Sequence, residues 1–284
     1  MLDILFVILC FLAIVLLWIM LYDSNRFVVV RHEIKDKRIK KKIKAVCLAD
    51  LHNKSFGKDN AHLLEIIHQE KPDVVLIAGD ILTAKPKEKM DVAVHVIQEL
   101  AQKYPIYYGN GNHEHRMKLY PEVYGDMAEQ YEEKLQEAGV QRLVNEKKEI
   151  PDSGIVVYGS EIDKTYYKRF KVQHMDDDYL DGILGKANSN EYTILLAHNP
   201  DYFPMYAKWK ADLVLSGHVH GGMVRIPFGK GVVSPNVRFF PKYDGGVFEE
   251  GGSKMILSRG LGMHTIPIRL FNPGELIVID FAGE

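Results

Sequence analysis

The chain has 284 residues, of which 46% are hydrophobic, enough apolar material for a sizeable core. Its two cysteines, Cys10 and Cys47, lie in separate apolar runs, which excludes a disulfide framework and a cysteine-based zinc site. The formal net charge is -2, but residues 1–44 carry nine Lys and Arg against four Asp and Glu, so the remainder has a net charge of -7. Because nucleic-acid-binding proteins more often have a basic folded body, no nucleic acid is predicted as a partner.

Residues 5–22 form an uncharged apolar run, near the lower limit of length for a helix that spans a bilayer, and Trp18 and Tyr22 suit one interface. The acidic Asp3 and the bulky residues near Trp18 disfavour a cleaved signal peptide. A core helix this apolar on every side would need a larger protein around it. We therefore predict one N-terminal transmembrane helix, a membrane anchor over residues 1–24.

Basic residues follow this segment, beginning with Arg26, and no Lys or Arg precedes it. The positive-inside rule then predicts a single-pass membrane protein whose folded domain lies in the cytoplasm. A second interpretation stays open, because the run that starts at Phe27 also alternates like a strand with a charged, solvated face. Residues 25–42 are accordingly described as a basic neck and a candidate first strand.

From Ile43 onward, strand-like and helix-like patterns alternate, which is typical of an α/β fold, and residues 43–284 are predicted to form one domain. Helices are expected over residues 60–70, 90–102 and 121–138, with a short helix opened by Asp176, Asp177 and Asp178. Strands are expected over residues 74–78, 106–108, 193–197, 213–216, 255–258 and 276–281, and a hairpin over 142–159.

Five of the apolar runs end in side chains that can bind a metal ion. These side chains are Asp50 and His52, Asp80, Asn112, His198, and His218 with His220. Asp50 and His52 would point to the same side if their strand continued through them. Because α/β folds place ligands at the carboxyl ends of parallel strands, all seven side chains are expected in one cleft.

The chemistry of this set favours two divalent metal ions. Asp80 follows the small Gly79, which permits close approach, and its two oxygens make it the natural bridge between two ions. Asn112 can bind a metal through its carbonyl oxygen without adding charge. The mixture of oxygen and nitrogen ligands suits manganese, iron or zinc better than calcium.

In this order, the motifs Asp-x-His, Gly-Asp, Gly-Asn-His-Glu, a single His and Gly-His-x-His resemble those of the calcineurin-like metallophosphoesterases. The resemblance runs from Ile43 onward and implies a four-layer αββα sandwich. It also implies one metal site made by Asp50, His52, Asp80 and His220, and another made by Asp80, Asn112, His198 and His218. The segments 217–222 and 259–262 look like the membrane-associated branch, some of whose members act on lipid-linked phosphodiesters or pyrophosphates.

The predicted function is hydrolysis of phosphate diesters or pyrophosphates by in-line attack of a hydroxide that bridges two metal ions about 3.5–4 Å apart. His113, next to Asn112, is the predicted catalytic general acid or phosphate contact, and Glu114 would orient the loop. The alternatives are a nucleotide or protein phosphomonoesterase, or an inactive membrane-tethered binding protein. No role is assigned to His115 or His264.

The predicted partners are a phosphate-ester substrate, with a lipid-linked one as a hypothesis, and the membrane; no oligomeric state is predicted. The hypothesis rests on a loop in which aromatic residues lie near cations, against the alternative of an ordinary loop packed on its own domain. The residues concerned are Phe228, Phe239, Phe240 and Tyr243, with Arg225 and Arg238.

Overall fold

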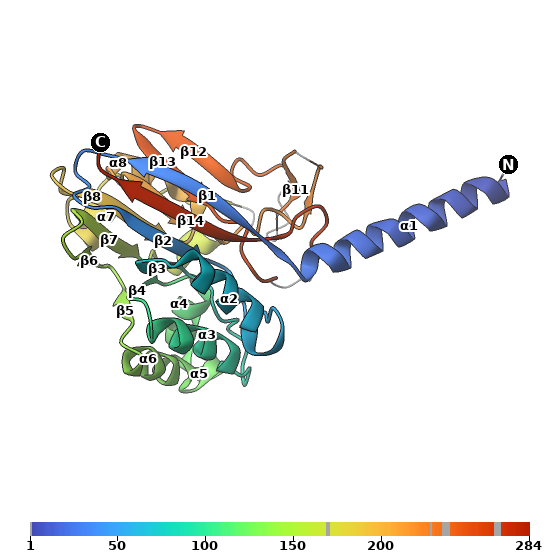
Figure 1. The fold of residues 1–284 in the computed structure, drawn as a ribbon, viewed down its shortest axis with the longest axis horizontal. Coiled ribbons are helices and arrows are strands. Elements are labelled where there is room, and N and C mark those ends of the chain that lie inside the picture. Colours follow the sequence, from blue (N-terminus) through green and yellow to red (C-terminus); the bar gives the residue numbers. More distant parts are fainter. Residues whose placement is uncertain (1, 169–170, 228, 235–238, 264–267) are drawn as a thin grey trace.

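Two six-stranded sheets face one another and helices cover their outer surfaces (Figure 1). The computed structural model describes residues 2–168, 171–227, 229–234, 239–263 and 268–284. The predicted fold class, an α/β sandwich of four layers preceded by an apolar helix, is confirmed.

The first sheet has the strand order β1-β14-β2-β3-β4-β5. Its strands are β1 (Phe27–Lys35), β14 (Gly274–Ala282), β2 (Ile43–Leu48), β3 (Val74–Ala78), β4 (Ile106–Gly109) and β5 (Gln141–Leu143). The strands β2, β3, β4 and β5 run parallel, whereas β14 is antiparallel to β2. The N-terminal strand β1 pairs in parallel with β14 along its whole length, from Phe27 opposite Gly274 to Lys35 opposite Ala282.

The second sheet has the strand order β12-β13-β9-β8-β7-β6. Its strands are β12 (Gly246–Glu250), β13 (Ser253–Leu257), β9 (Leu213–Ser216), β8 (Tyr192–Ala197), β7 (Ile155–Ser160) and β6 (Glu146–Ile150). The strands β7, β8, β9 and β13 are parallel, and an antiparallel strand lies at each edge. A separate two-stranded ribbon consists of β10 (Val224–Arg225) and β11 (Gly231–Val233).

Alternation along the central strands supplies three apolar layers. In β3, Val75 and Ile77 face the helices, while Leu76 faces the other sheet. The same alternation in β8 sends Leu196 between the sheets and Leu195 to the outer side. This double burial explains why both strands read as continuous apolar runs.

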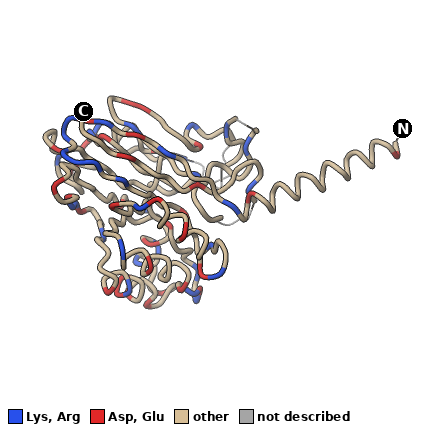
Figure 2. The backbone as a smooth tube through the Cα atoms, in the orientation of Figure 1, with Lys and Arg blue, Asp and Glu red and all other residues tan. Residues whose placement is uncertain are grey.

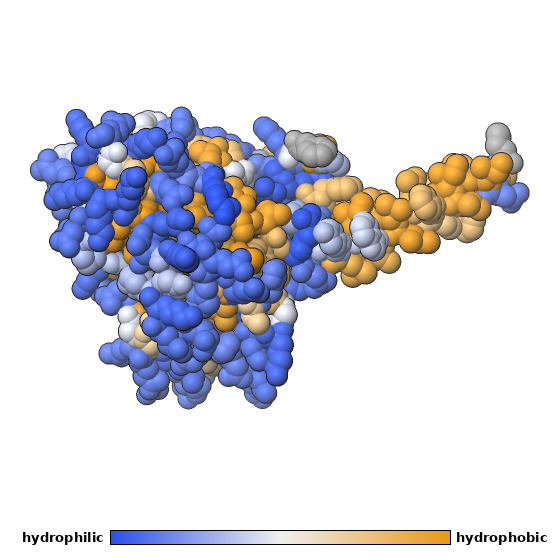
Figure 3. Space-filling view, in the orientation of Figure 1, coloured by the Kyte–Doolittle hydropathy of each residue, from blue (hydrophilic) through white to orange (hydrophobic). Residues whose placement is uncertain are grey.

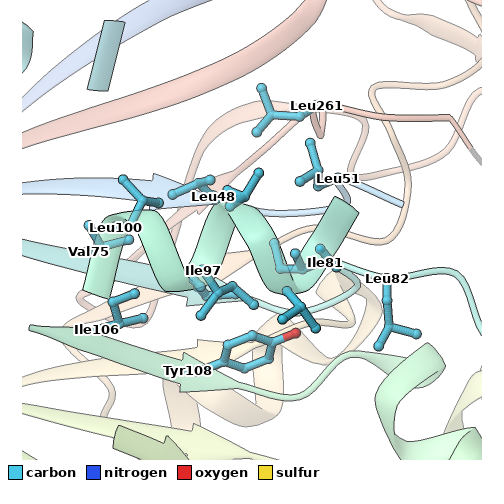
Figure 4. Packing of buried hydrophobic residues seen from close by; sticks show 14 of the residues in the cluster. Leu48, Leu51, Val75, Ile81, Leu82, Ile97, Leu100, Ile106, Tyr108 and Leu261 are labelled. Carbon is cyan, nitrogen blue, oxygen red and sulfur yellow. The ribbon is translucent and has the colours of Figure 1, made fainter. Parts of the chain in front are cut away.

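The outer layers are helical. Three helices contribute side chains to the core beside the first sheet: α2 (Ala61–Glu70), α3 (Asp91–Ala101) and α6 (Met127–Glu137). Two others contribute side chains to the core beside the second sheet: α7 (Tyr179–Leu184) and α8 (Phe203–Lys208). Figure 4 shows Leu100 of α3 beside Leu48 of β2 and Val75 of β3. Three short 3-10 turns complete the domain: η1 (Lys58–Asn60), η2 (Lys164–Tyr167) and η3 (Pro200–Tyr202).

The helix α1 (Leu2–Ser24) projects away from the domain as an apolar rod (Figure 3). Its length and composition are sufficient to cross a membrane, and its apolar window is not buried against the domain. Figure 2 shows charged residues on α1 only near its two ends. Asp23, at its C-terminal end, is buried, so the helix is joined to the domain rather than connected by a loose linker.

Two predicted elements differ from the structure, and two observed elements were not predicted. The helix expected over residues 121–138 is split into α5 (Pro121–Tyr124) and α6, because Gly125 between them has a φ of 60°. The first arm of the hairpin expected over 142–159 is divided between the two sheets, so that only β6 pairs with β7. The helix α4 (Asn112–Leu119) and the edge strand β12 were not predicted.

Candidate metal centre

The seven predicted ligands follow the carboxyl ends of β2, β3, β4, β8 and β9, as expected from the α/β pattern. The strand does not continue through Asp50 and His52, because β2 ends at Leu48, so strand alternation does not set the directions of these two side chains. Asp50 and His52 instead have φ values of 50° and 48°, in the left-handed region. Asp80, His218 and His220 also have positive φ. Such backbone costs on the order of 1–3 kcal/mol at each residue, and it persists only where the surrounding structure holds it.

The first group of side chains consists of Asp50, His52 and His220, which are all buried. The two histidine Nε2 atoms lie 3.2 Å apart. The Oδ1 atom of Asp50 lies 3.7 Å from Nε2 of His52 and 3.5 Å from Nε2 of His220. Potential ligand atoms of these three residues therefore lie within 4.8 Å of one another, which is close enough to surround one cation.

The second group consists of Asp80, His198 and His218. Nε2 of His198 lies 3.0 Å from Oδ2 of Asp80, and the same oxygen lies 3.8 Å from Nε2 of His52 in the first group. The carboxylate of Asp80 therefore stands between the two groups. The Oδ1 atom of Asp50 also lies 3.7 Å from Nε2 of His198, and the bridging role of Asp80 stays a prediction.

Two buried atoms in this region fit a cation. Among the described residues, Oδ1 of Asn112 has no hydrogen-bond partner. The Nδ1 atom of His198 lies 2.7 Å from the carbonyl oxygen of Ala78 and can donate to it, so that Nε2, which faces the carboxylate of Asp80 over 3.0 Å, becomes a metal ligand once its proton is lost. Because buried polar atoms are normally paired, the orphaned oxygen of Asn112 supports a site for divalent metal.

The electrostatics of the centre keep its carboxylates ionised. Burial raises the pKa of the Asp50 carboxyl, but His220, His52 and His198 together hold it below its ordinary value. Burial also raises the pKa of Asp80, and His198 and His113 lower it by more. Burial and the nearby His198 lower the pKa of His218 to about 4, so its imidazole is neutral, as a metal ligand must be.

His113 lies at the start of α4, and both its backbone and its ring are held. Its backbone N–H donates to Oδ1 of Asp80 over 2.8 Å. Its Nδ1 accepts the backbone N–H of Ala84, also over 2.8 Å, so the neutral ring carries its proton on Nε2. Nε2–H is the donor that a general acid or a phosphate contact requires. His113 also forms a cluster with His52 and Asp80 that could hold a metal.

Glu114 connects two of the turns that carry predicted ligands. Its buried carboxylate accepts the backbone N–H groups of Asp80, Ile81 and Gly111, each over 3.0 Å, and the hydroxyl of Tyr108 over 2.6 Å. The turn after β3 and the turn before Asn112 are thus fixed to the same side chain. This arrangement gives Glu114 the orienting position that the sequence indicates.

Glycines allow these turns to approach one another. A Cβ atom on Gly111 would collide with the carboxylate of Asp80, and one on Gly217 would collide with that of Asp50. The backbone N–H of His218 can then donate to Asp50, with 3.0 Å to each of its oxygens. The contact of Gly217 with Asp50 joins the two sheets at this edge, whereas that of Gly111 with Asp80 joins neighbouring turns of the first sheet.

Two residues that stabilise the centre belong to none of the sequence motifs and were not predicted. Asn272 donates through Nδ2 to the carbonyl oxygens of His220 and Gly222, and its backbone N–H donates over 3.0 Å to Oδ2 of Asp23 at the end of α1. The buried Arg269 donates to the carbonyl oxygens of Arg259, Gly260 and Gly262 beside Asp50. The loop that bears His220 is therefore bonded, through Asn272, to the apolar helix.

The loop residues considered for lipid contact divide into two kinds. Phe239 and Phe240 are 68% and 63% exposed, whereas Tyr243 is buried in the core of the second sheet. Arg225 donates to three backbone carbonyls and lies 3.3 Å from Asp244, so it serves the local structure. Phe228, Arg238 and His264 lie outside the described residues. His115, to which no role was assigned, lies 3.8 Å from the carboxylate of Glu161.

The model of the family described as calcineurin-like phosphoesterase matches residues 43–222, which include all seven predicted ligands. The chain therefore belongs to the calcineurin-like phosphoesterase family. Its clusters of His and Asp are compatible with the dinuclear divalent metal site that the sequence predicts.

Individual relatives carry the same family name. A metallophosphoesterase of Helicobacter pylori strain 26695, described as uncharacterized, is 30% identical over 243 residues, which cover 84% of this chain and 60% of that protein. A similarly described protein of Campylobacter jejuni is 26% identical, with 89% of this chain and 62% of that protein covered. The chain thus spans about three fifths of the length of these two relatives.

A relative from Aquifex aeolicus is 26% identical over 261 residues and is covered to 92% of its length. Among solved structures, a sulfate thiohydrolase of Thermus thermophilus in complex with glycerol is 14% identical, with a TM-score of 0.47, over 84% of this chain and 56% of that one.

Proposed function

We propose that this chain is a membrane-anchored phosphoesterase that uses two divalent metal ions to hydrolyse phosphate diesters or pyrophosphates of amphiphilic, lipid-linked substrates at the cytoplasmic face. The observation that carries the hydrolytic part is the convergence of two ligand groups on the carboxylate of Asp80, beside the orphaned oxygen of Asn112. Manganese, iron and zinc are the ions that this donor set favours.

One ion would be held by Asp50, His52, Asp80 and His220. The other ion would be held by Asp80, Asn112, His198 and His218. When bound, such a pair of ions supplies an activated water and neutralises phosphate oxygens. The Nε2–H of His113 would donate to the phosphate or to the leaving oxygen, since its Nδ1 accepts the N–H of Ala84. Glu114 would keep Asp80 and the Gly111 turn in place throughout.

Two observations support the membrane part of the proposal. The end of α1 is bonded to the loop of His220 through Asn272, so the metal centre lies on the anchored side of the domain. A cavity lined by Asp23 and Arg26 on one side and by Ile226 and Gly229 on the other places the turn between β10 and β11 beside α1. Ile226, Phe239 and Phe240 are exposed on this ribbon and the segment paired with it, where apolar side chains can enter a bilayer interface.

The test of the substrate class uses the full chain in detergent, loaded with manganese, iron or zinc, on matched monoesters, diesters and lipid pyrophosphates. The proposal expects turnover of diesters or pyrophosphates, and faster turnover of the lipid-bearing member of each pair. Turnover of monoesters alone would replace the proposal with a phosphomonoesterase. No turnover with any metal, together with normal metal content, would favour a binding protein.

The double substitution Phe239→Ser and Phe240→Ser should lower kcat/KM for a lipid-bearing substrate about ten-fold while changing that for a small soluble diester by less than about two-fold. The reason is that two exposed aromatic rings lose their contact with acyl chains, each worth on the order of 1 kcal/mol. Val123→Ser, at an exposed position on α5, is the matched control. Equal losses on both substrates would remove the support for lipid contact.

Metal uptake should release a proton. In the metal-free protein, burial lowers the pKa of His198, but Asp80 and Asp50 raise it by more, to about 10. Because a metal binds only the neutral imidazole, binding at neutral pH must displace this proton, and the apparent metal affinity should rise with pH up to that value. Titration calorimetry in two buffers with different ionisation enthalpies measures the release. Heats that do not depend on the buffer would contradict it.

A further inference from the structure

A cavity of about 270 Å³ opens beside Asn112 on the side of the centre formed by α4 and η2. Its volume is enough for a phosphate-sized group and the atoms that join it to a reacting phosphate. The residues around it are Asn112, His115, Arg116, Leu119, Tyr120, Lys164, Thr165, Tyr167 and Lys168.

The helix α4 connects this cavity to the metal centre. Asn112, Arg116 and Leu119 lie at positions i, i+4 and i+7 of the helix, and therefore on one face. The first of them is a predicted metal ligand, and the second is a cation one turn farther along. The opposite wall is Tyr167, whose ring centroid lies 5.3 Å from that of His218 and 6.5 Å from that of His198. Asn112 on one wall of the cavity and Tyr167 on the other thus also border the metal centre.

The lining of the cavity is positively charged. Arg116, Lys164 and Lys168 line it, and within the described part of the chain no carboxylate does. None of these three cations forms an ion pair with another described residue. Two carboxylates lie near the lining without belonging to it: Glu161 accepts Nδ2 of Asn110 and lies 3.8 Å from His115, and Asp163 accepts the backbone N–H of Thr165.

One of the cations is held in position by its neighbours. Nζ of Lys164 donates to the hydroxyl of Tyr120 over 3.2 Å and lies 4.9 Å from the centre of that ring. The turn η2, which carries Lys164 and Tyr167, is capped at its start by Asp163. The cavity therefore has at least one fixed cation next to its aromatic and apolar wall.

A single phosphate does not account for this charge. Two divalent ions would bring four positive charges, of which Asp50 and Asp80 would neutralise two, and the reacting phosphate and the attacking hydroxide would neutralise the other two. Arg116, one helical turn from Asn112, and Lys164 and Lys168 in and after η2 would then have no anion within the cavity to face. Cations gathered in a cavity with no acid are the usual means of binding phosphate or carboxylate.

From this arrangement we propose that the substrate carries a second phosphate group, one linkage away from the phosphate that reacts, and that Arg116, Lys164 and Lys168 bind it. This inference rests on the proposed function and narrows it to pyrophosphates and to phosphodiesters with a neighbouring phosphate. Leu119, Tyr120 and Tyr167 line the space where the remainder of the substrate leaves the cavity.

The experiment uses the full chain in detergent with saturating manganese and measures inhibition of bis(4-nitrophenyl) phosphate hydrolysis. Three probes are compared: methylphosphonate, with one anionic group; phosphonoacetate, with a carboxylate as the second group; and methylenediphosphonate, with two phosphonates. Methylenediphosphonate should bind at least ten-fold more tightly than methylphosphonate and more tightly than phosphonoacetate. The factor corresponds to one or more charge-assisted hydrogen bonds.

The double variant Arg116→Gln with Lys168→Gln should reduce the preference for methylenediphosphonate over methylphosphonate to about three-fold or less. Both positions are exposed, so the fold should tolerate the changes. Lys118→Gln is the matched control, because Lys118 lies on the same helix but lines a different cavity. It should keep the full preference.

Equal binding of the probes by the unmodified protein, or an unchanged preference in the double variant, would overturn the proposal. A preference for phosphonoacetate would overturn the choice of phosphate. Failure of the proposed function would look different, because bis(4-nitrophenyl) phosphate would not be hydrolysed with any metal. Calorimetric titration of the same probes into the metal-loaded protein would then still report whether the cavity binds a second phosphate.

Discussion

Replacing Asp80 with Asn should lower the metal content of the protein and reduce turnover on the order of 10³-fold or more, a barrier increase of about 4 kcal/mol. Asp80 stands between the two ligand groups, with Oδ2 3.0 Å from His198 and 3.8 Å from His52, so the substitution removes a charge from both. The fold should survive, since the amide oxygen of Asn can still accept the backbone N–H of His113.

Elemental analysis and steady-state kinetics on the same preparation measure the two effects, and circular dichroism reports the fold. Asp126→Asn, at an exposed position before α6 whose side chain makes no capping hydrogen bond, is the control. Two full equivalents of metal and a normal rate in the Asp80 variant would show that Asp80 does not bridge two ions.

The variant His113→Ala separates a proton donor from a metal ligand. If Nε2–H of His113 donates to the substrate, the variant should keep its metal and lose about 10²–10⁴-fold in rate. The loss should shrink for substrates with good leaving groups, because these need less protonation of the leaving oxygen. Kinetics on a series of aryl phosphodiesters with graded leaving-group pKa measures this trend.

The control for that series is His174→Ala, which removes a histidine whose side chain is exposed. Loss of a metal equivalent in the His113 variant would instead identify His113 as a ligand, in agreement with its proximity to His52 and Asp80. An unchanged rate on esters with poor leaving groups, with full metal content, would show that His113 is neither a proton donor nor a metal ligand.

The predicted ligands could be found from sequence because each ends an apolar run, and parallel strands bring such ends together. Asp80 and His198 belong to different sheets, yet both follow strands that read as continuous apolar segments. Side-chain direction was less predictable. The left-handed backbone of Asp50 and His52 depends on contacts between turns, such as the approach of Gly217 to Asp50, and no local pattern encodes it.

The residues that stabilise the centre from outside were not predictable for a related reason. Asn272 acts through hydrogen bonds to backbone carbonyls far away in sequence, and Arg269 through bonds to carbonyls of its own irregular loop, and such bonds require no periodicity or motif. The helix α4 was missed because few of its residues are apolar and its face toward the cavity is polar. The break at Gly125 was missed because the helical spacing on either side of it is nearly continuous.

The position of β14 between β1 and β2 has a consequence for the order of events during synthesis. Among the described strands, β14 is the sole neighbour of β1 in its sheet, so β1 cannot be placed until residues 274–282 have been made. At about 5–20 residues per second, translation reaches them tens of seconds after β1 has emerged. Under the proposed anchoring, α1 enters the bilayer early, and the nascent chain waits beside it with an unpaired strand. Pairing across so great a sequence separation makes this late step slow, and chaperones would have the whole interval in which to bind β1.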